Sequence, residues 1–162
     1  IDMKIKVLIG SLLLMTFIVG CSGLGNSTAL AGVKIANEKL EKDDSPVRYV
    51  ANESQYGVSF QPYLIGKIAP SIADSILKVD ALKLIMQKED TQDIELIQTR
   101  FVSHSSDPIS FKEVWVVKRT KDNELHAHSI QFIQSQQNDT DIKLSGEARA
   151  FEEMLKKTQS EL

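Results

Sequence analysis

Residues 111 to 120 read Phe-Lys-Glu-Val-Trp-Val-Val-Lys-Arg-Thr, and they have the strongest strand character in this 162-residue chain. Valine, tryptophan and phenylalanine are all enriched in β-strands. Because successive residues of a strand point to opposite faces, the apolar run from 114 to 117 places apolar side chains on both faces. We therefore expect this stretch to be a central strand, with further structure packed against each face of the sheet.

Strand patterns also lie on both sides of this stretch. Residues 94 to 104 and 125 to 134 are β-prone, and the polar turns 105 to 110 and 121 to 123 connect them to it. Short connections favour antiparallel pairing of neighbouring strands, so the pattern predicts a meander. Residues 142 to 144 could extend the pairing.

Helical patterns flank this meander. Amphipathic spacing predicts a short helix over 33 to 42, and Pro70 suits the first turn of a helix ending near 78. The apolar residues of 81 to 88 alternate with other residues, so we expect a strand there; the alternative is that the helix runs on to Gln87. The remaining predicted elements are short β-prone segments at 47 to 50 and 57 to 65, and a closing helix over 146 to 157 with Ser145 as its N-cap.

These elements together predict an α+β fold, with a curved antiparallel sheet of about four to six strands packed by helices. A helix that precedes a meander containing Glu-Val-Trp-Val-Val resembles the cystatin-like and nuclear-transport-factor-2-like classes. This likeness is one of pattern and implies the architecture alone, because a fold does not determine a function.

The beginning of the chain has the layout of a secretory signal. Lys4 and Lys6 precede an apolar run over 7 to 19, which is shorter than the roughly 20 residues that a membrane-spanning helix needs. The run ends in Ile18-Val19-Gly20-Cys21, which resembles the lipobox of bacterial lipoprotein precursors. The resemblance implies cleavage before Cys21 and acylation of its thiol and of the new amino terminus. The alternatives are an uncleaved anchor and an ordinary signal peptide cut elsewhere.

The single cysteine favours the lipoprotein interpretation, because an unpaired thiol is a liability in an oxidising compartment and acylation removes it. We expect a signal peptide over 1 to 20, an acylated cysteine with a flexible tether over 21 to 32, and one α+β domain over 33 to 162. The expected location is the cell envelope. In a Gram-negative cell, Ser22 after the cysteine resembles outer-membrane lipoproteins, and the resemblance implies the outer membrane, with the domain facing the periplasm.

Charge excludes some partners. The net charge is −3 for the whole chain, and the part from Cys21 onward has 17 basic and 21 acidic residues. Without a cluster of lysine or arginine, this mild acidity argues against nucleic acid and against electrostatic binding to anionic lipids. We expect attachment to the membrane through acyl chains instead.

His126 and His128 are weak candidates for a metal site. Two residues apart on a strand, their rings point to the same face and could reach one ion, with Glu124 or Asp122 as a further ligand. His104 is expected at the opposite end of the meander, too far away to join them. Solvated or half-buried histidines without a metal are the alternative, and we expect neither a metal nor a cofactor.

Phe111 and Trp115 share one strand face and could line a ligand pocket or a partner surface, or they could belong to the core. The sequence contains no Gly-x-Ser-x-Gly elbow and no phosphate-binding glycine loop, so we expect no enzyme. The leading hypothesis is a lipid-anchored envelope protein that acts through protein contacts. The alternative is a module that binds a small apolar ligand or an envelope component between sheet and helices.

Overall fold

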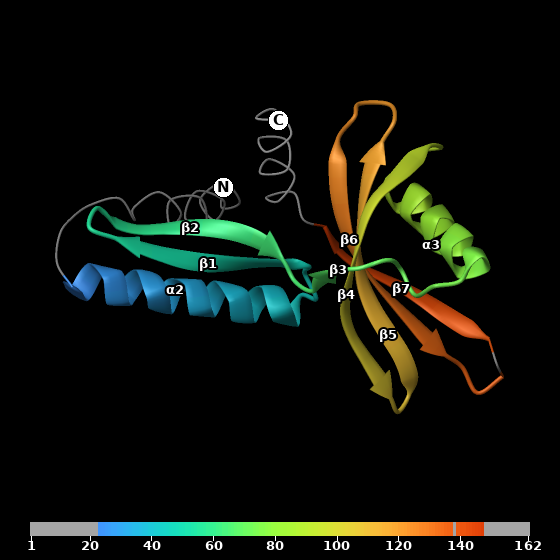
Figure 1. Cartoon of the computed structure of the whole chain (residues 1–162), viewed down its shortest axis with the longest axis horizontal. Helices are drawn as coiled ribbons and strands as arrows, with labels where there is room; N and C mark the ends of the chain where they lie inside the picture. Colours follow the sequence, from blue (N-terminus) through green and yellow to red (C-terminus); the bar gives the residue numbers. More distant parts are fainter. Residues whose placement is uncertain (1–22, 138, 148–162) are drawn as a thin grey trace, which may run out of the picture.

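The computed structural model describes residues 23–137 and 139–147, which form two parts (Figure 1). The first part, which we call the arm, consists of a long helix against a two-stranded hairpin. Its elements are α2 (Gly23–Lys42), β1 (Val47–Ser54) and β2 (Gly57–Leu64). The second part, the sheet domain, is a five-stranded sheet with one helix against it. This division confirms the α+β class and shows two antiparallel sheets where one was expected.

The large sheet is antiparallel throughout, with the strand order β3-β4-β5-β6-β7. The predicted central strand is β5, which lies between β4 and β6. The connections from β4 to β5 and from β5 to β6 are short, as expected for antiparallel neighbours. The strands are β3 (Lys67–Ile68), β4 (Ile94–Ser106), β5 (Ile109–Arg119), β6 (Leu125–Gln134) and β7 (Thr140–Glu147).

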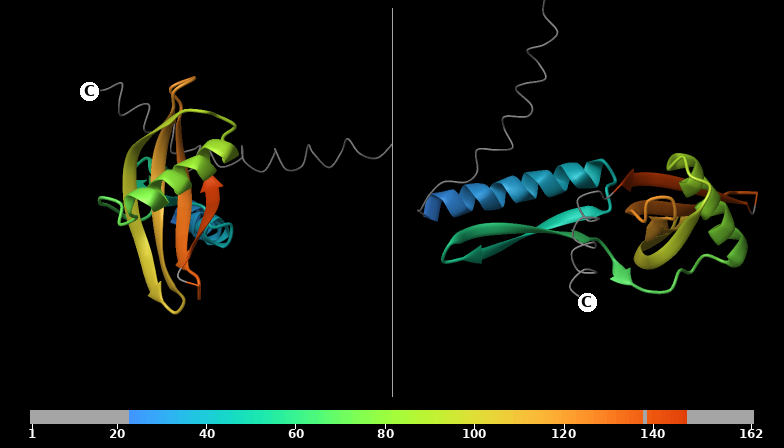
Figure 2. Two further views of the ribbon diagram at one scale, coloured as in Figure 1. Left: turned by 90° about the vertical axis from the view of Figure 1, so that its right-hand side faces the viewer. Right: turned by 90° about the horizontal axis from the view of Figure 1, so that it is seen from above.

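The two faces of β5 are both buried, as its apolar run predicts. Trp115 and Val117 point to the face that α3 (Ser75–Lys88) covers, where they form a core with Ile85 of that helix. Figure 2 shows α3 lying across one side of the sheet. Val114 and Val116 point to the other face, where they pack against Val47 and Leu64 at the base of the arm.

The helix α3 corrects two predictions. It begins at Ser75 after the N-cap Asp74, whose carboxylate accepts hydrogen bonds from the N–H groups of Ile76 and Leu77 at 2.9 Å each. The helix therefore starts five residues later than Pro70. It also continues to Lys88, so the strand expected over 81 to 88 is wrong. Ala81 and Ile85, four residues apart, are the helix residues buried against the sheet.

The arm corrects the expected tether. α2 begins at Gly23, so residues 23 to 32 are helical instead of forming a flexible link. The helix is fixed to the hairpin by Asn37, whose amide Nδ2 donates to the Tyr49 carbonyl at 2.9 Å while its Oδ1 accepts from the Tyr49 N–H at 2.8 Å. These two bonds satisfy the N–H and the carbonyl of Tyr49 on the side of β1 that has no strand neighbour.

The arm meets the sheet domain at a joint formed by residues 44 to 47, 65 to 66 and 145 to 146. The Asp44 carboxylate contacts Lys112 of β5 and the hydroxyl of Ser145 in β7. The Ile65 N–H donates to the Pro46 carbonyl at 3.1 Å. Ser145 is therefore a strand residue and not the expected N-cap, since β7 runs to Glu147. The remainder of the predicted closing helix, from 148 to 157, lies outside the described residues.

Candidate functional site

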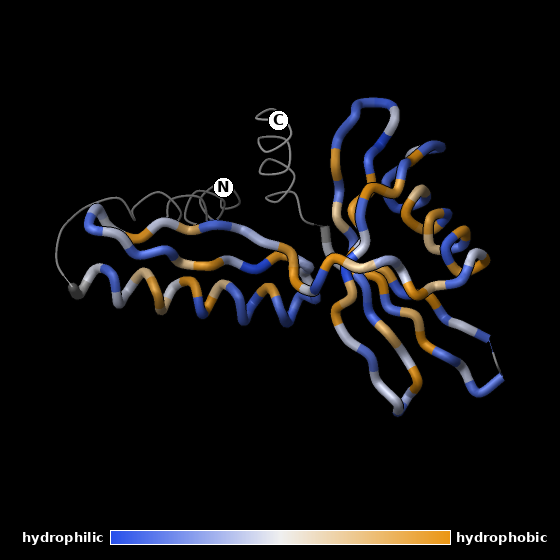
Figure 3. The backbone as a smooth tube through the Cα atoms, viewed as in Figure 1, coloured by the Kyte–Doolittle hydropathy of each residue, from blue (hydrophilic) through white to orange (hydrophobic). Residues whose placement is uncertain are grey.

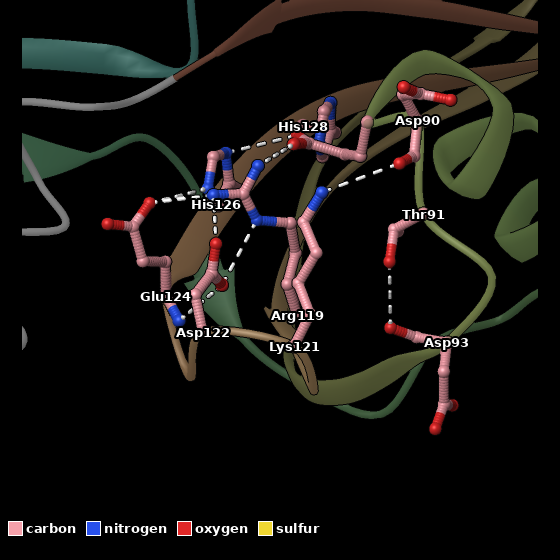
Figure 4. A network of polar contacts seen from close by, with 10 residues as sticks. Asp90, Thr91, Asp93, Arg119, Lys121, Asp122, Glu124, His126 and His128 are labelled. Carbon is pink, nitrogen blue, oxygen red and sulfur yellow. Dashed lines mark hydrogen bonds and ion pairs between the residues drawn. The ribbon is translucent and has the colours of Figure 1, made fainter.

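A cluster of polar side chains lies where the end of α3 meets β5 and β6 (Figure 4). Glu89 forms the C-cap of α3, and its N–H donates to the Ile85 carbonyl at 2.9 Å. The next residue, Asp90, has a φ of 48° and ends the helix there. This local geometry holds the Glu89 side chain, of which 4% is exposed, against the sheet.

The two predicted histidines both reach this carboxylate. His128 Nε2 lies 2.7 Å from Glu89 Oε1, and His126 Nδ1 lies 3.1 Å from the same oxygen. Both rings point to the α3 face of β6, as their two-residue spacing predicts. The Glu89 carboxylate can accept a hydrogen bond from Nε2–H of His128, whereas His126 Nδ1 lies within ion-pair distance of the same oxygen. The three side chains therefore form a buried histidine–glutamate–histidine group.

Arg119, at the end of β5, supplies the positive charge of the cluster. Its guanidinium lies 2.6 Å from Asp122 Oδ2 and 2.7 Å from Glu124 Oε2, and its Nη1 lies 3.4 Å from Glu89 Oε2. Burial would lower the pKa of Arg119, but its hydrogen bond with Asp122 and the surrounding negative charges raise the pKa. Arg119 is therefore a permanent cation between three carboxylates.

The turn between β5 and β6 holds the outer edge of the cluster. Partial desolvation would raise the pKa of Asp122, but hydrogen bonds from the Glu124 N–H and from Arg119 lower it. Asp122 thus stays ionised at more acidic pH than a free aspartate. The turn also brings Lys121 Nζ to 3.5 Å from the Asp90 carbonyl, which ties it to the end of α3.

The cluster differs from the metal site considered from the sequence. Glu124 does approach the histidine pair, with its Oε2 3.6 Å from His126 Nε2, whereas Asp122 pairs with Arg119. Among the described residues, no three histidine, cysteine, aspartate or glutamate side chains are grouped so that they could hold a metal ion. A fixed guanidinium next to Glu89 already neutralises part of the negative charge that would attract a cation.

His104 is remote from the pair. It pairs with Phe111 across the sheet, whereas His126 pairs with Val117, six residues further along β5. At about 3.3 Å per residue this separation is roughly 20 Å along the strand. The position of His104 agrees with the meander predicted from the sequence.

Phe111 and Trp115 belong to the core and do not line a pocket. Trp115 is fully buried, and its indole Nε1–H donates to Glu113 Oε2 at 2.7 Å. Phe111 stacks on Phe132 with 4.5 Å between ring centroids. Both aromatic side chains thus stabilise the layer under α3, as expected from the alternative in which they belong to the core.

Glu113 is a buried carboxylate that the sequence did not single out. In addition to the Trp115 indole, the hydroxyl of Ser71 and the N–H of Ile72 donate to it at 2.7 and 2.8 Å. These bonds fasten the segment before α3 to the centre of β5. With three donors around it, the carboxylate has a structural role and is closed to a substrate.

Ile18 to Cys21, the residues expected to form a lipobox, lie outside the described part of the chain, and α2 begins two residues after Cys21. No helix within the described ranges is both long and apolar enough to cross a lipid bilayer. Comparison with known proteins gives no match to any family model, any curated protein or any solved structure.

Proposed function

We propose that this chain is a lipid-anchored protein of a bacterial cell envelope, acylated on Cys21, that acts through protein contacts and not as an enzyme. The observation that carries the proposal is the sequence Ile18-Val19-Gly20-Cys21 at the end of a short apolar run, followed after two residues by a folded arm. In a Gram-negative cell the proposed location is the outer membrane, with the sheet domain in the periplasm.

The packing of the sheet domain supports protein contacts over ligand binding. The layer between α3 and the sheet is filled by fully buried side chains, among them Ile85, Trp115 and Phe132. Apolar side chains are exposed on the outer side of α3 and just before it, where Ile76, Val79 and Ile72 are 71, 50 and 59% exposed. A filled core beneath exposed apolar side chains suits a protein partner better than an enclosed small molecule.

The polar cluster around Glu89 supports a non-catalytic role. Its two histidines are 4% and 0% exposed, so a substrate could not reach either ring without displacement of α3. The charges of the cluster are directed at one another, and they fix the end of α3 to the turn between β5 and β6. We interpret the cluster as a structural element that stabilises the sheet domain.

The alternative function, a ligand-binding module, has one feature in its favour. A shallow hollow of about 530 Å³ lies beside the last turn of α3 and is lined by Lys83, Met86, Gln87, Asp90, Thr91 and Gln92. Polar and apolar surface line it in equal parts, so the hollow fits an envelope component or an apolar ligand equally well.

Affinity capture from native membranes tests the proposal, with wild type compared to Cys21→Ala. We expect the wild-type protein to sediment with membranes and to carry acyl chains on Cys21 by mass spectrometry. The variant should keep its signal segment and lose the acyl mass. An uncleaved, unacylated wild-type chain would contradict the anchor, and recovery of a small molecule in place of a protein partner would favour the alternative.

A further inference from the structure

The far end of the arm brings together two segments that are distant in sequence. The first turn of α2 and the turn between β1 and β2 lie side by side at the end of the arm that points away from the sheet domain (Figures 1 and 2). Gly23, at the start of α2, is two residues from Cys21, and two residues of extended chain span at most about 7 Å. An acylated Cys21 therefore places this end of the arm at the membrane surface.

We propose that the hairpin turn Ser54–Gly57 is a second membrane contact, in which Tyr56 enters the lipid head-group region beside the acyl chains of Cys21. This inference rests on the proposed lipid anchor. It adds a protein surface, a named side chain and an orientation, none of which acylation alone would supply.

The turn presents Tyr56 outward on a fixed backbone. The Ser54 hydroxyl accepts a hydrogen bond from the Tyr56 N–H and donates one to the Gly57 carbonyl, both at 3.2 Å. Gly57 has a φ of 120°, which favours glycine and fixes the direction of the turn. Tyr56 is 91% exposed, the largest exposed fraction among the exposed large apolar and aromatic residues of the described chain. Tyrosine combines an apolar ring with a polar hydroxyl and is enriched at membrane–water interfaces.

The charge distribution along the arm agrees with this placement. Residues 23 to 32 of α2 carry no charged side chain, whereas the half of α2 nearer the sheet domain carries Lys34, Glu38, Lys39, Glu41 and Lys42. The hairpin has one charged side chain near its turn, Glu53. Figure 3 shows the same contrast along α2, where hydrophilic residues concentrate toward the sheet domain. With Glu53 as its one charged side chain, this end can approach lipid head groups at a lower cost of dehydrating charges than the charged half of α2.

The second contact would hold the arm upright. Acyl chains on one residue leave the direction of the arm free, whereas a contact at the neighbouring turn restrains it. The 20 residues of α2 span about 30 Å at 1.5 Å per residue, so an upright arm holds the sheet domain that far from the bilayer. The exposed apolar residues of α3 would then be available to a partner away from the lipid.

Tryptophan reporters in the acylated full-length protein test this orientation. Tyr56→Trp places a reporter in the turn. Tyr63→Trp is the matched control on β2, seven residues away or roughly 23 Å. Ile35→Trp reports on the middle of α2. Tyr63 and Ile35 are 44 and 66% exposed, so each position accepts a larger ring, and the native Trp115 is buried and gives a constant background.

Each protein is reconstituted in phosphatidylcholine vesicles with or without lipids brominated near the head group. We expect bromine to at least halve the added emission of Tyr56→Trp and to leave the other two variants unchanged. Equal quenching in Tyr56→Trp and Tyr63→Trp, with acyl chains present on Cys21, would overturn the membrane contact of the hairpin turn and leave the lipid anchor intact. Quenching of Ile35→Trp would show that α2 lies along the membrane surface, which would also overturn the proposed upright arm. Absence of acyl chains in protein from native membranes would overturn both proposals.

Discussion

At the scale of single residues, Glu89 holds the polar cluster together. One oxygen of its carboxylate lies within 3.1 Å of both histidine rings, and the other lies 3.4 Å from Arg119. The two-residue spacing of His126 and His128 predicted that their rings share a face. Their partner could not be predicted, because Glu89 is 37 residues before His126 in the sequence and has the composition of a polar turn. Its role depends on where α3 ends over the sheet.

Glu89→Gln is expected to destabilise the protein by about 3 kcal/mol, because it removes one partner of a buried charged group while keeping its size. A glutamine side chain also places an NH₂ donor next to the donors of Arg119 and His128, which need an acceptor. The free energy of unfolding, measured with urea at neutral pH, checks this value. The control is Glu124→Gln, since Glu124 has a 42% exposed side chain and should lose at most about 1 kcal/mol. Equal losses in the two variants would mean that Glu89 does not organise the cluster.

At the scale of elements, strands were easier to predict than helices. The strand expected over 125 to 134 matches β6 in full, because β-prone residues and turn signals coincide there. A strand was preferred to a helix running to Gln87 because Leu82, Leu84 and Met86 alternate as in a strand, although burial follows the four-residue spacing of Ala81 and Ile85.

The early start of α2 was missed for a different reason. Residues 23 to 32 include three glycines, which disfavour helix formation in isolation. The later part of α2 is held on the hairpin by Asn37 and Tyr49, and tertiary packing commonly provides most of the stability of a helix. A single sequence does not reveal this contact, because Asn37 and Tyr49 are twelve residues apart and lie in different elements.

The N-cap of α3 provides a test at this scale. Asp74→Ala removes the acceptor for two N–H groups at the start of the helix and should cost about 1 kcal/mol. Asp80→Ala is the control on the same helix, because Asp80 forms an exposed pair with Lys83 at 3.2 Å, worth roughly 0.5 kcal/mol or less. Thermal unfolding would report both losses, and hydrogen exchange would localise the first to α3. A loss in Asp74→Ala no larger than that in Asp80→Ala would contradict the capping role.

At the scale of the whole molecule, the joint determines how the arm is held on the sheet domain. Val47 and Leu64 of the arm share a core with Val114 and Val116 of β5. Gly66, with a φ of 90°, lies so close to β4 that a Cβ there would be 2.5 Å from the Phe101 carbonyl oxygen. The chain therefore leaves the arm against the sheet, with no room for a flexible linker at this point. If the arm stands on a membrane, this joint transmits its orientation to the sheet domain.

Gly146→Ala tests the joint. Gly146 has a φ of 70°, and a Cβ there would lie 2.7 Å from Pro46 Cδ and 3.0 Å from the Asp44 carbonyl oxygen. Backbone strain and this contact together should cost about 2 kcal/mol or more in the free energy of unfolding. We also expect faster hydrogen exchange at the Ile65 N–H, which donates to the Pro46 carbonyl.

Two further variants separate the causes of that loss. Asparagine adopts a left-handed backbone more readily than alanine, but it also carries a Cβ. If the contact with Pro46 destabilises the joint, Gly146→Asn should therefore still speed hydrogen exchange at the Ile65 N–H. Gly32→Ala lies in α2 with nothing within 4 Å of its added Cβ, and it should stabilise the protein by about 1 kcal/mol. Unchanged exchange at Ile65 in both Gly146 variants would show that the arm is not held by this close approach, and that the shared core of Val47, Leu64 and β5 alone sets its direction.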